Sequence, residues 1–191
     1  MSHFFAYLSR MRFIRRWNIM RNTQSENIQE HSLQVSMVAH ALCRIKNRYY
    51  DGRVDEGKVL ALAVYHEAPE VITGDLSTPI KYFNPEIKHA YKKVEQIAAS
   101  TLLAMLPDDL QAEYQPLLLP DETSEEWQIV KAADRICAYL KCVEEMKAGN
   151  MEFEKAQANI RSSIDRLGRP EVSYFMEKFA PSFSLSLDEL N

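Results

Sequence analysis

The sequence contains few of the residues that build strands, disulfide frameworks or membrane spans. Only five glycines occur among 191 residues, and alternating runs of Val, Ile and Thr are rare, which favours helices over strands. No apolar run approaches the roughly 18 uncharged residues that indicate a membrane-spanning helix. Arginines interrupt the aliphatic residues near the N-terminus, so no signal peptide is expected there. The sequence predicts a soluble, cytoplasmic, helical protein.

Cysteine and net positive charge are also scarce. Three cysteines, Cys43, Cys137 and Cys142, form an odd set without a Cys-x-x-Cys pair, which argues against a disulfide framework or a zinc ribbon. The formal net charge of −4 gives no basic field, so neither nucleic acid nor a membrane surface is expected as a partner. Hydrophobic residues make up 46% of the chain, which is enough for one domain to bury a core.

Hydrophobic residues that do occur follow a helical spacing along most of the chain. The pattern predicts an all-α single domain of about six or seven helices, joined by loops rich in Pro, Gly and Asp. The predicted helices cover about residues 2–12, 30–48, 55–72, 86–106, 127–147, 152–167 and 170–179.

Candidate metal ligands lie on three of these predicted helices. His31 begins one helix, His66 and Glu67 follow the apolar run of the next, and Asp134 interrupts the apolar string "VKAADRICAYL". His40 lies nine residues beyond His31, on the opposite helix face at about 100° per residue, and therefore cannot share its site. Two imidazoles with carboxylates suit a divalent ion such as manganese, cobalt, iron or nickel. Such a site leaves positions for water and substrate.

Each of these residues taken alone also has a simpler explanation. His31 could be an exposed residue in a first helical turn, and His66 with Glu67 could be a helix end in water. Asp134 could pair with Lys131 or Arg135. The string "HEAPE" lacks the second histidine of the His-Glu-x-x-His zinc protease motif, and its proline would kink the required helix, so that class is set aside. The order of the residues is more specific than any one of them.

The order His31, His66-Glu67, Asp134 resembles the HD-domain metal-dependent phosphohydrolases. The likeness is closer to the bacterial 5′-deoxynucleotidases of the YfbR type, and it extends over essentially the whole chain. It is carried by the segments "RWNIMRN", "ENIQEHSLQVSMVAHAL", "YHEAPEVITGDLSTPIKYF", "VKAADRICAYLKCVEEM" and "FAPSFSLSLDEL", in that order. The resemblance implies a single HD-type helical bundle over residues 1–191, a homodimer, and one divalent metal ion, cobalt, manganese or copper.

The resemblance also implies a role for each matching residue. The reaction would convert a deoxyribonucleoside 5′-monophosphate to the nucleoside and phosphate, with selection against ribonucleotides. Glu70 would position or deprotonate the attacking water. The implied metal ligands are His31, His66, Glu67 and Asp134, and the implied substrate-binding residues are Arg16, Trp17, Glu67, Asp75, Leu76, Ser77 and Thr78.

The residue chemistry agrees with two of these roles independently. Trp17 offers a flat face on which any base can stack, and Arg16 can make planar, charged hydrogen bonds to phosphate or sugar. In the absence of the resemblance, the same string "RRW" would equally describe an arginine face beside a core tryptophan.

One departure from the family pattern concerns the acid beside His66. The family carries His-Asp, and this chain carries His-Glu, whose carboxylate is one methylene longer. Two alternatives to the deoxynucleotidase therefore stay open. One is another HD phosphohydrolase, acting on a triphosphate or on a cyclic or signalling nucleotide, although the acidic surroundings of the motif favour a monophosphate. The other is a non-enzymatic nucleotide sensor in which Glu67 has weakened the metal site.

Overall fold

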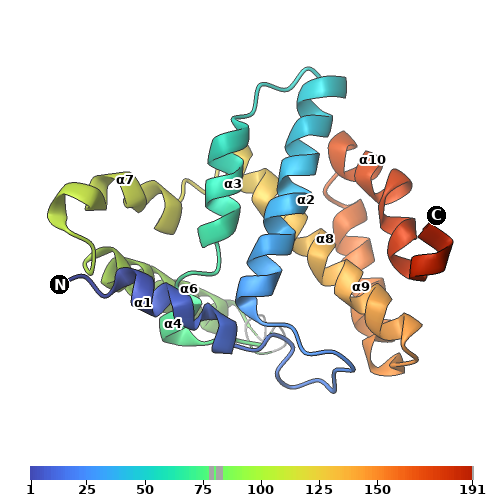
Figure 1. The fold of residues 1–191 in the computed structure, drawn as a ribbon, viewed down its shortest axis with the longest axis horizontal. Coiled ribbons are helices and arrows are strands. Elements are labelled where there is room, and N and C mark those ends of the chain that lie inside the picture. Colours follow the sequence, from blue (N-terminus) through green and yellow to red (C-terminus); the bar gives the residue numbers. More distant parts are fainter. Residues whose placement is uncertain (78–79, 81–83, 191) are drawn as a thin grey trace.

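The fold consists of helices packed around two long central ones. The structure is a computed structural model that describes residues 1–77, 80 and 84–190. These residues form helices and no β-strand (Figure 1). The one β-type pairing among them is an isolated antiparallel bridge between Arg15 and Asn27. The predicted all-α fold is confirmed.

Many of the helices follow one another with short connections, whereas a long irregular segment over residues 14–27 joins η1 (Ser9–Phe13) to α2 (Ile28–Tyr49). Seven of those described have nine or more residues; six of these overlap predicted helices, whereas α7 over Asp108–Leu118 was not predicted, and the predicted helix over residues 2–12 is two short elements. None of the helices in the described part of the chain combines the length and hydropathy needed to cross a membrane. The elements are α1 (Phe4–Leu8), η1 (Ser9–Phe13), α2 (Ile28–Tyr49), α3 (Glu56–Tyr65), α4 (Glu70–Thr73), α6 (Pro85–Leu103), α7 (Asp108–Leu118), α8 (Glu125–Lys147), η2 (Met151–Phe153), α9 (Glu154–Asp165), α10 (Pro170–Lys178), η3 (Ala180–Ser184) and η4 (Leu187–Leu190).

The core holds α2 and α8 in fixed positions. The two helices cross at the centre of the molecule, with α3 and α10 packed on α2 (Figure 1). Leu42 of α2, Leu62 of α3 and Ile136 of α8 are almost fully buried in one hydrophobic cluster. Burial of one such side chain contributes about 1.5–3 kcal/mol. A second cluster, which includes Phe4 and Leu102, packs α1 against α6. Polar side chains on α2 and α8 are therefore carried by the most rigid part of the fold.

The N-terminus of α2 is defined by a capping box. The side chain of Asn27 accepts hydrogen bonds from the backbone N–H groups of Gln29 and Glu30, each at 3.0 Å. The Glu30 carboxylate accepts in return from the Asn27 backbone N–H at 3.2 Å. These bonds satisfy N–H groups that have no partner within the helix. They fix the first turn of α2, which carries His31.

The predicted helix over residues 55–72 is wrong in its second half. α3 ends at Tyr65, a turn covers residues 66–69, and the short α4 begins at Glu70. Pro69 has no N–H, and its ring would clash with the carbonyl of Tyr65, so a continuous helix cannot pass through it. His66, Glu67 and Glu70 consequently lie around a corner, not along one helix face.

Candidate metal and substrate site

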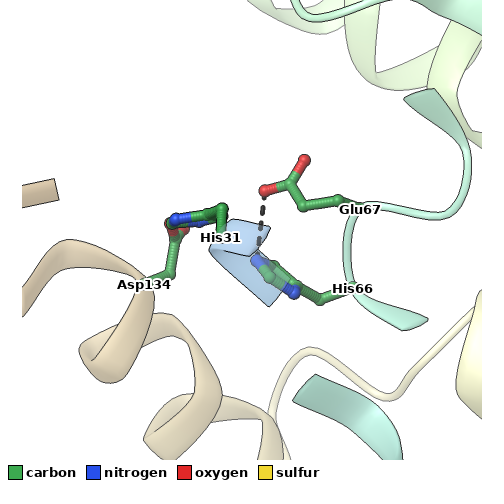
Figure 2. A group of neighbouring side chains, drawn as sticks. All are labelled: His31, His66, Glu67 and Asp134. Atoms are coloured by element: carbon green, nitrogen blue, oxygen red, sulfur yellow. Dashed lines mark hydrogen bonds and ion pairs between the residues drawn. The ribbon is translucent and has the colours of Figure 1, made fainter. Parts of the chain in front are cut away.

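The four predicted metal ligands converge on one point. His31 comes from the first turn of α2, His66 from the end of α3, Glu67 from the following turn, and Asp134 from the middle of α8. One nitrogen or oxygen atom of each lies within 4.8 Å of the corresponding atoms of the others (Figure 2). Segments separated by as many as 103 residues thus present two imidazoles and two carboxylates to one small volume.

His31 and Asp134 form one side of this group. The His31 ring is fully buried, which rules out the exposed first-turn alternative, and its Nε2 lies 3.1 Å from Asp134 Oδ1. The second oxygen of Asp134 accepts from Lys131 Nζ at 2.6 Å, so the ion pair considered for Asp134 also exists. Burial alone would raise the pKa of Asp134, but Lys131 and His31 hold it well below its usual value. Asp134 is therefore an ionised acceptor inside the group.

His66 gives the clearest indication of a cation. Its Nδ1 lies 2.7 Å from the carbonyl oxygen of Ala63. A carbonyl can only accept, so Nδ1 carries a proton and Nε2 is the nitrogen that could bind a cation. Nε2 is buried, has no hydrogen-bond partner among the described residues, and lies 3.1 Å from Glu67 Oε1 (Figure 2). A buried nitrogen and a carboxylate oxygen at this distance share either a proton or a bound cation. The donor set therefore fits a divalent ion.

Glu70 lies beside the four-residue group without belonging to it. Its carboxyl is buried, and its Oε2 has no hydrogen-bond partner within the described residues. Burial and the neighbouring charge of Glu67 raise the pKa of Glu70 well above its usual value. Burial would also raise the pKa of Glu67, but His66 and the hydrogen bond with Glu70 lower it well below the usual range. Glu70 thus holds the proton of the pair, which is the behaviour expected of two adjacent carboxyls.

Arg16 lies at the centre of a ring of carboxylates. Its Nε donates to Glu26 Oε2 at 3.1 Å, and one terminal nitrogen lies 3.8 Å from Glu67 Oε1. Burial would lower the pKa of Arg16, but Glu67, Glu26, Asp134 and Asp75 together raise it. The predicted substrate residue is therefore charged and adjacent to the predicted metal ligands.

Trp17 has an unusual backbone conformation. Its φ is 56°, which is in the left-handed region that bulky side chains rarely adopt. Such a conformation costs of order 1–3 kcal/mol and persists only where its surroundings impose it. The ring packs against Phe153 at a centroid distance of 5.3 Å, and the indole Nε1 is buried with no hydrogen-bond partner among the described residues. Strain and an unpaired donor together are typical of a binding position.

The two predicted substrate-binding segments lie against each other. Asn18 Nδ2 donates to the backbone oxygen of Asp75 at 3.0 Å, and Ser77 Oγ donates to Asn18 Oδ1 at 2.7 Å. Leu76 lies between them and is half-buried. Thr78 lies outside the described residues. Arg16, Trp17, Asp75 and Ser77 are therefore brought to one side of the metal group.

Two residues that contribute to this site were not predicted. Asn18 joins the two substrate-binding segments, and Glu26 joins Arg16 to His31, whose Nδ1 lies 3.5 Å from Glu26 Oε1. Both lie in an irregular segment where hydrophobic periodicity gives no signal. A usable signal for Glu26 does exist, because a histidine ligand needs an acceptor for its second nitrogen. Glu26 is the acid that precedes His31 just outside the helix.

Known proteins resemble this chain over its whole length. Residues 3–183 match a family model described as 5′-deoxynucleotidase YfbR-like. Proteins of Photorhabdus temperata and Vibrio vulnificus, both described as 5′-deoxynucleotidases, are 55% and 53% identical to it, with coverage of 100% of this chain and 98% of each relative.

Solved structures resemble the fold at lower identity. An HD-domain phosphohydrolase from Listeria innocua superposes with a TM-score of 0.84 at 22% identity, covering 95% of this chain and 88% of the other. The HD phosphohydrolase of cyanophage S-2L, solved with dA and one catalytic Zn²⁺ ion, superposes with a TM-score of 0.64 at 19% identity, covering 93% and 96%.

Proposed function

The chain belongs to the YfbR-like 5′-deoxynucleotidase family, and from this premise we propose that the group of His31, His66, Glu67 and Asp134 is the metal centre of its active site. The protein is an enzyme that hydrolyses deoxyribonucleoside 5′-monophosphates to deoxyribonucleosides and phosphate. The observation that supports the metal centre best is the buried, unpaired Nε2 of His66 facing Glu67. The Glu67 carboxylate lies 3.1 Å from this nitrogen, which supports the proposal that it serves as the fourth ligand despite its extra methylene.

The proposed ion is divalent, with cobalt, manganese and copper as candidates. Mixed imidazole and carboxylate donors suit these borderline ions better than magnesium or calcium, which prefer oxygen ligands alone. When bound, such an ion supplies Lewis acidity towards a phosphoryl oxygen and makes water more acidic.

Glu70 is the proposed proton acceptor. Its side chain is next to Glu67, and its raised pKa makes its ionised form a stronger base than an ordinary carboxylate, which suits a general base. In the reaction the ionised form of Glu70 would take a proton from the water that attacks phosphorus. Arg16, which is charged and has a rigid planar set of donors, would hold the phosphate and stabilise its developing charge.

Selection for deoxyribose is proposed to come from the Arg16–Trp17 segment and the Asp75–Thr78 turn. Close packing of Trp17 against the sugar would leave a 2′-hydroxyl without a hydrogen-bond partner. A pocket that rejects an added hydroxyl in this way typically discriminates by about 100-fold. We therefore expect kcat/KM for dAMP to exceed that for AMP by about this factor.

The family resemblance and an exposed apolar surface together support a homodimer. Leu33 and Met37 of α2 and Leu60 and Val64 of α3 are all exposed, and they lie four residues apart on two helices that pack against each other. We propose that a second copy of the chain covers these exposed apolar side chains in the dimer. Light scattering should give twice the chain mass for the wild type and a lower mass for Met37→Glu.

The enzyme is proposed to act in the cytoplasm, as a single HD-type domain over residues 1–191. The three cysteines support a reducing compartment, because all are free and buried. A small nucleotide is the proposed substrate, with no nucleic acid or membrane partner.

The test is phosphate release by metal-stripped protein supplied with cobalt, manganese, copper or magnesium. Release from dAMP that requires added metal, with little release from AMP, is the expected result. The matched variant His66→Gln should lose metal binding by calorimetry, while His40→Gln, a partly exposed histidine on α2, should bind as the wild type does. Metal-independent release, or metal binding that survives His66→Gln, would contradict the proposed centre.

A further inference from the structure

The loop that carries Arg16 and Trp17 is closed at its base. The backbone N–H of Arg16 donates to the oxygen of Glu26 at 3.0 Å, and that of Ile28 donates to Ile14 at 3.1 Å. The intervening chain extends below α2 towards the end of α8 (Figure 1). The two backbone bonds and the capped start of α2 fix this base. The part of the loop beyond Trp17 lies away from the base and needs other contacts to hold it.

A single buried carboxylate receives that part of the loop. Glu145, in the last turns of α8, is 1% exposed. Its oxygens accept from the Thr23 backbone N–H at 2.9 Å, the Thr23 hydroxyl at 2.7 Å and the Gln24 N–H at 3.3 Å. They also accept from Asn150 Nδ2 at 2.9 Å and from Lys141 Nζ. All of its hydrogen-bonding capacity is used, and three of the five donors belong to the loop.

The neighbours of Glu145 hold the same loop. Lys141 Nζ donates to the Gln24 oxygen at 2.5 Å, and Asn150 Nδ2 donates to the Arg21 oxygen at 2.7 Å. Phe153 lies against the ring of Trp17. The segment from Lys141 to Phe153 therefore contacts the loop at Trp17 and again between Arg21 and Gln24.

Inside the loop, Asn22 connects these contacts to Trp17. Its Nδ2 donates to the backbone oxygens of Trp17 at 3.1 Å and of Met20 at 2.8 Å. Asn22 lies in the chain directly between Arg21, which Asn150 contacts, and Thr23, which Glu145 contacts. The left-handed backbone of Trp17 is thus connected through Asn22, and through its neighbours Arg21 and Thr23, to the buried carboxylate of Glu145.

We propose that Glu145 is a positioning residue for substrate binding, which fixes the Trp17 loop in the conformation that receives the nucleoside. This inference rests on the proposed function, in which Trp17 contacts the substrate. Replacing Glu145 by Gln removes the charge and presents an amide N–H₂ to groups that are all donors, so part of the set must separate.

The expected result is a change in substrate affinity without a change in metal binding. Glu145→Gln should raise KM for dAMP roughly tenfold, the factor expected for losing hydrogen bonds to a charged group. kcat should change much less, because the metal ligands and Glu70 stay in place. Manganese affinity by calorimetry should equal that of the wild type.

Trp17 itself can report the motion of the loop. The chain has two tryptophans, so Trp127→Phe leaves Trp17 as the only indole. In that full-length background Glu145→Gln should lower the fluorescence anisotropy of Trp17 and raise its quenching by acrylamide. The matched control is Glu144→Gln, an exposed glutamate next to it on α8, which should change neither quantity. Thr23→Val removes one donor from the exposed side of the network and tests the same effect if Glu145→Gln folds poorly.

Trp17→Ala, measured in parallel, separates this inference from the proposed function. If Trp17→Ala leaves KM for dAMP unchanged, the proposed pocket is wrong and the role of Glu145 is overturned with it. If Trp17→Ala raises KM, but Glu145→Gln and Thr23→Val match Glu144→Gln in KM and in Trp17 anisotropy, the pocket stands and the positioning role is overturned. A rise in KM together with a fall in anisotropy supports it.

Discussion

Replacement of Glu26 by Gln tests whether the proposed metal ligand His31 and the proposed substrate residue Arg16 share one support. One oxygen of Glu26 lies 3.1 Å from Arg16 Nε, and the other lies 3.5 Å from His31 Nδ1. Both partners are donors when His31 binds a cation through Nε2, since Nδ1 then carries the proton. A carboxylate can accept from both at once. An amide has one oxygen, so Glu26→Gln must give up one of the two contacts.

The distances decide which contact is lost and how large the effect is. The Arg16 contact is charge-assisted and close, while 3.5 Å is long for a hydrogen bond to His31. The amide oxygen should therefore stay with Arg16 and leave His31 without its acceptor. Loss of such a support typically weakens metal binding 10–100-fold. The long starting distance favours the lower end, so we expect a roughly tenfold rise in the Kd for manganese, about 1.4 kcal/mol.

The assay is calorimetric titration of manganese into metal-stripped protein. Glu30→Gln is the control, because Gln maintains the capping box of α2 as well as Glu does. It places the same substitution on the exposed residue directly before His31. An unchanged Kd in Glu26→Gln would refute the reasoning, and so would an equal loss in both variants, which would indicate general damage to α2.

Three further predictions concern turnover, pH and phosphate binding. Glu70→Ala should keep calorimetric binding of manganese and dAMP but slow phosphate release by about 10²–10⁴-fold, and near-normal turnover would contradict its role. Burial alone would raise the pKa of Glu145, but the surrounding donors lower it from 4.5 to about 2. The ionised carboxylate therefore stabilises the fold fully above pH 4.5, and this contribution is lost as the pH falls towards 2. The contribution to the free energy of unfolding is about 3 kcal/mol, so that free energy, measured by urea unfolding across this pH range, should depend less on pH in Glu145→Gln than in the wild type. An equal pH dependence in both proteins would exclude this contribution. Arg16→Lys should weaken dAMP binding roughly tenfold through loss of the planar donor pair, while the exposed Arg15→Lys should bind as the wild type does in the same titration.

The helices and the grouping of the candidate metal ligands could be predicted because both leave local marks in the sequence. The apolar spacing of α2 and α8 shows which faces are buried, and an aspartate within the buried run of α8 requires a cationic partner. The order of His31, His66-Glu67 and Asp134 then indicates the family. The resemblance, and not the periodicity, specified the roles of Arg16 and Trp17.

The corner at Pro69 and the supports of the substrate loop could not be predicted in the same way. Apolar periodicity continues through Pro69, so the pattern alone suggested one helix where the chain turns. Glu145 acts on Thr23 across 122 residues, and Asn18 acts on Asp75 across 57. Contacts at such separations depend on how helices pack, which no local pattern records.

The arrangement of Arg16 and Lys131 among the acids has a consequence for how the enzyme matures. In a zinc finger the ligands repel or stay solvated until the ion arrives, and the chain is unfolded without it. Here Arg16 forms ion pairs with Glu26 and Glu67, while Lys131 forms one with Asp134. The chain can therefore complete its fold before it acquires an ion. Newly made protein would wait as a folded apo-enzyme, and metal supply would set the fraction that is active while leaving its abundance unchanged.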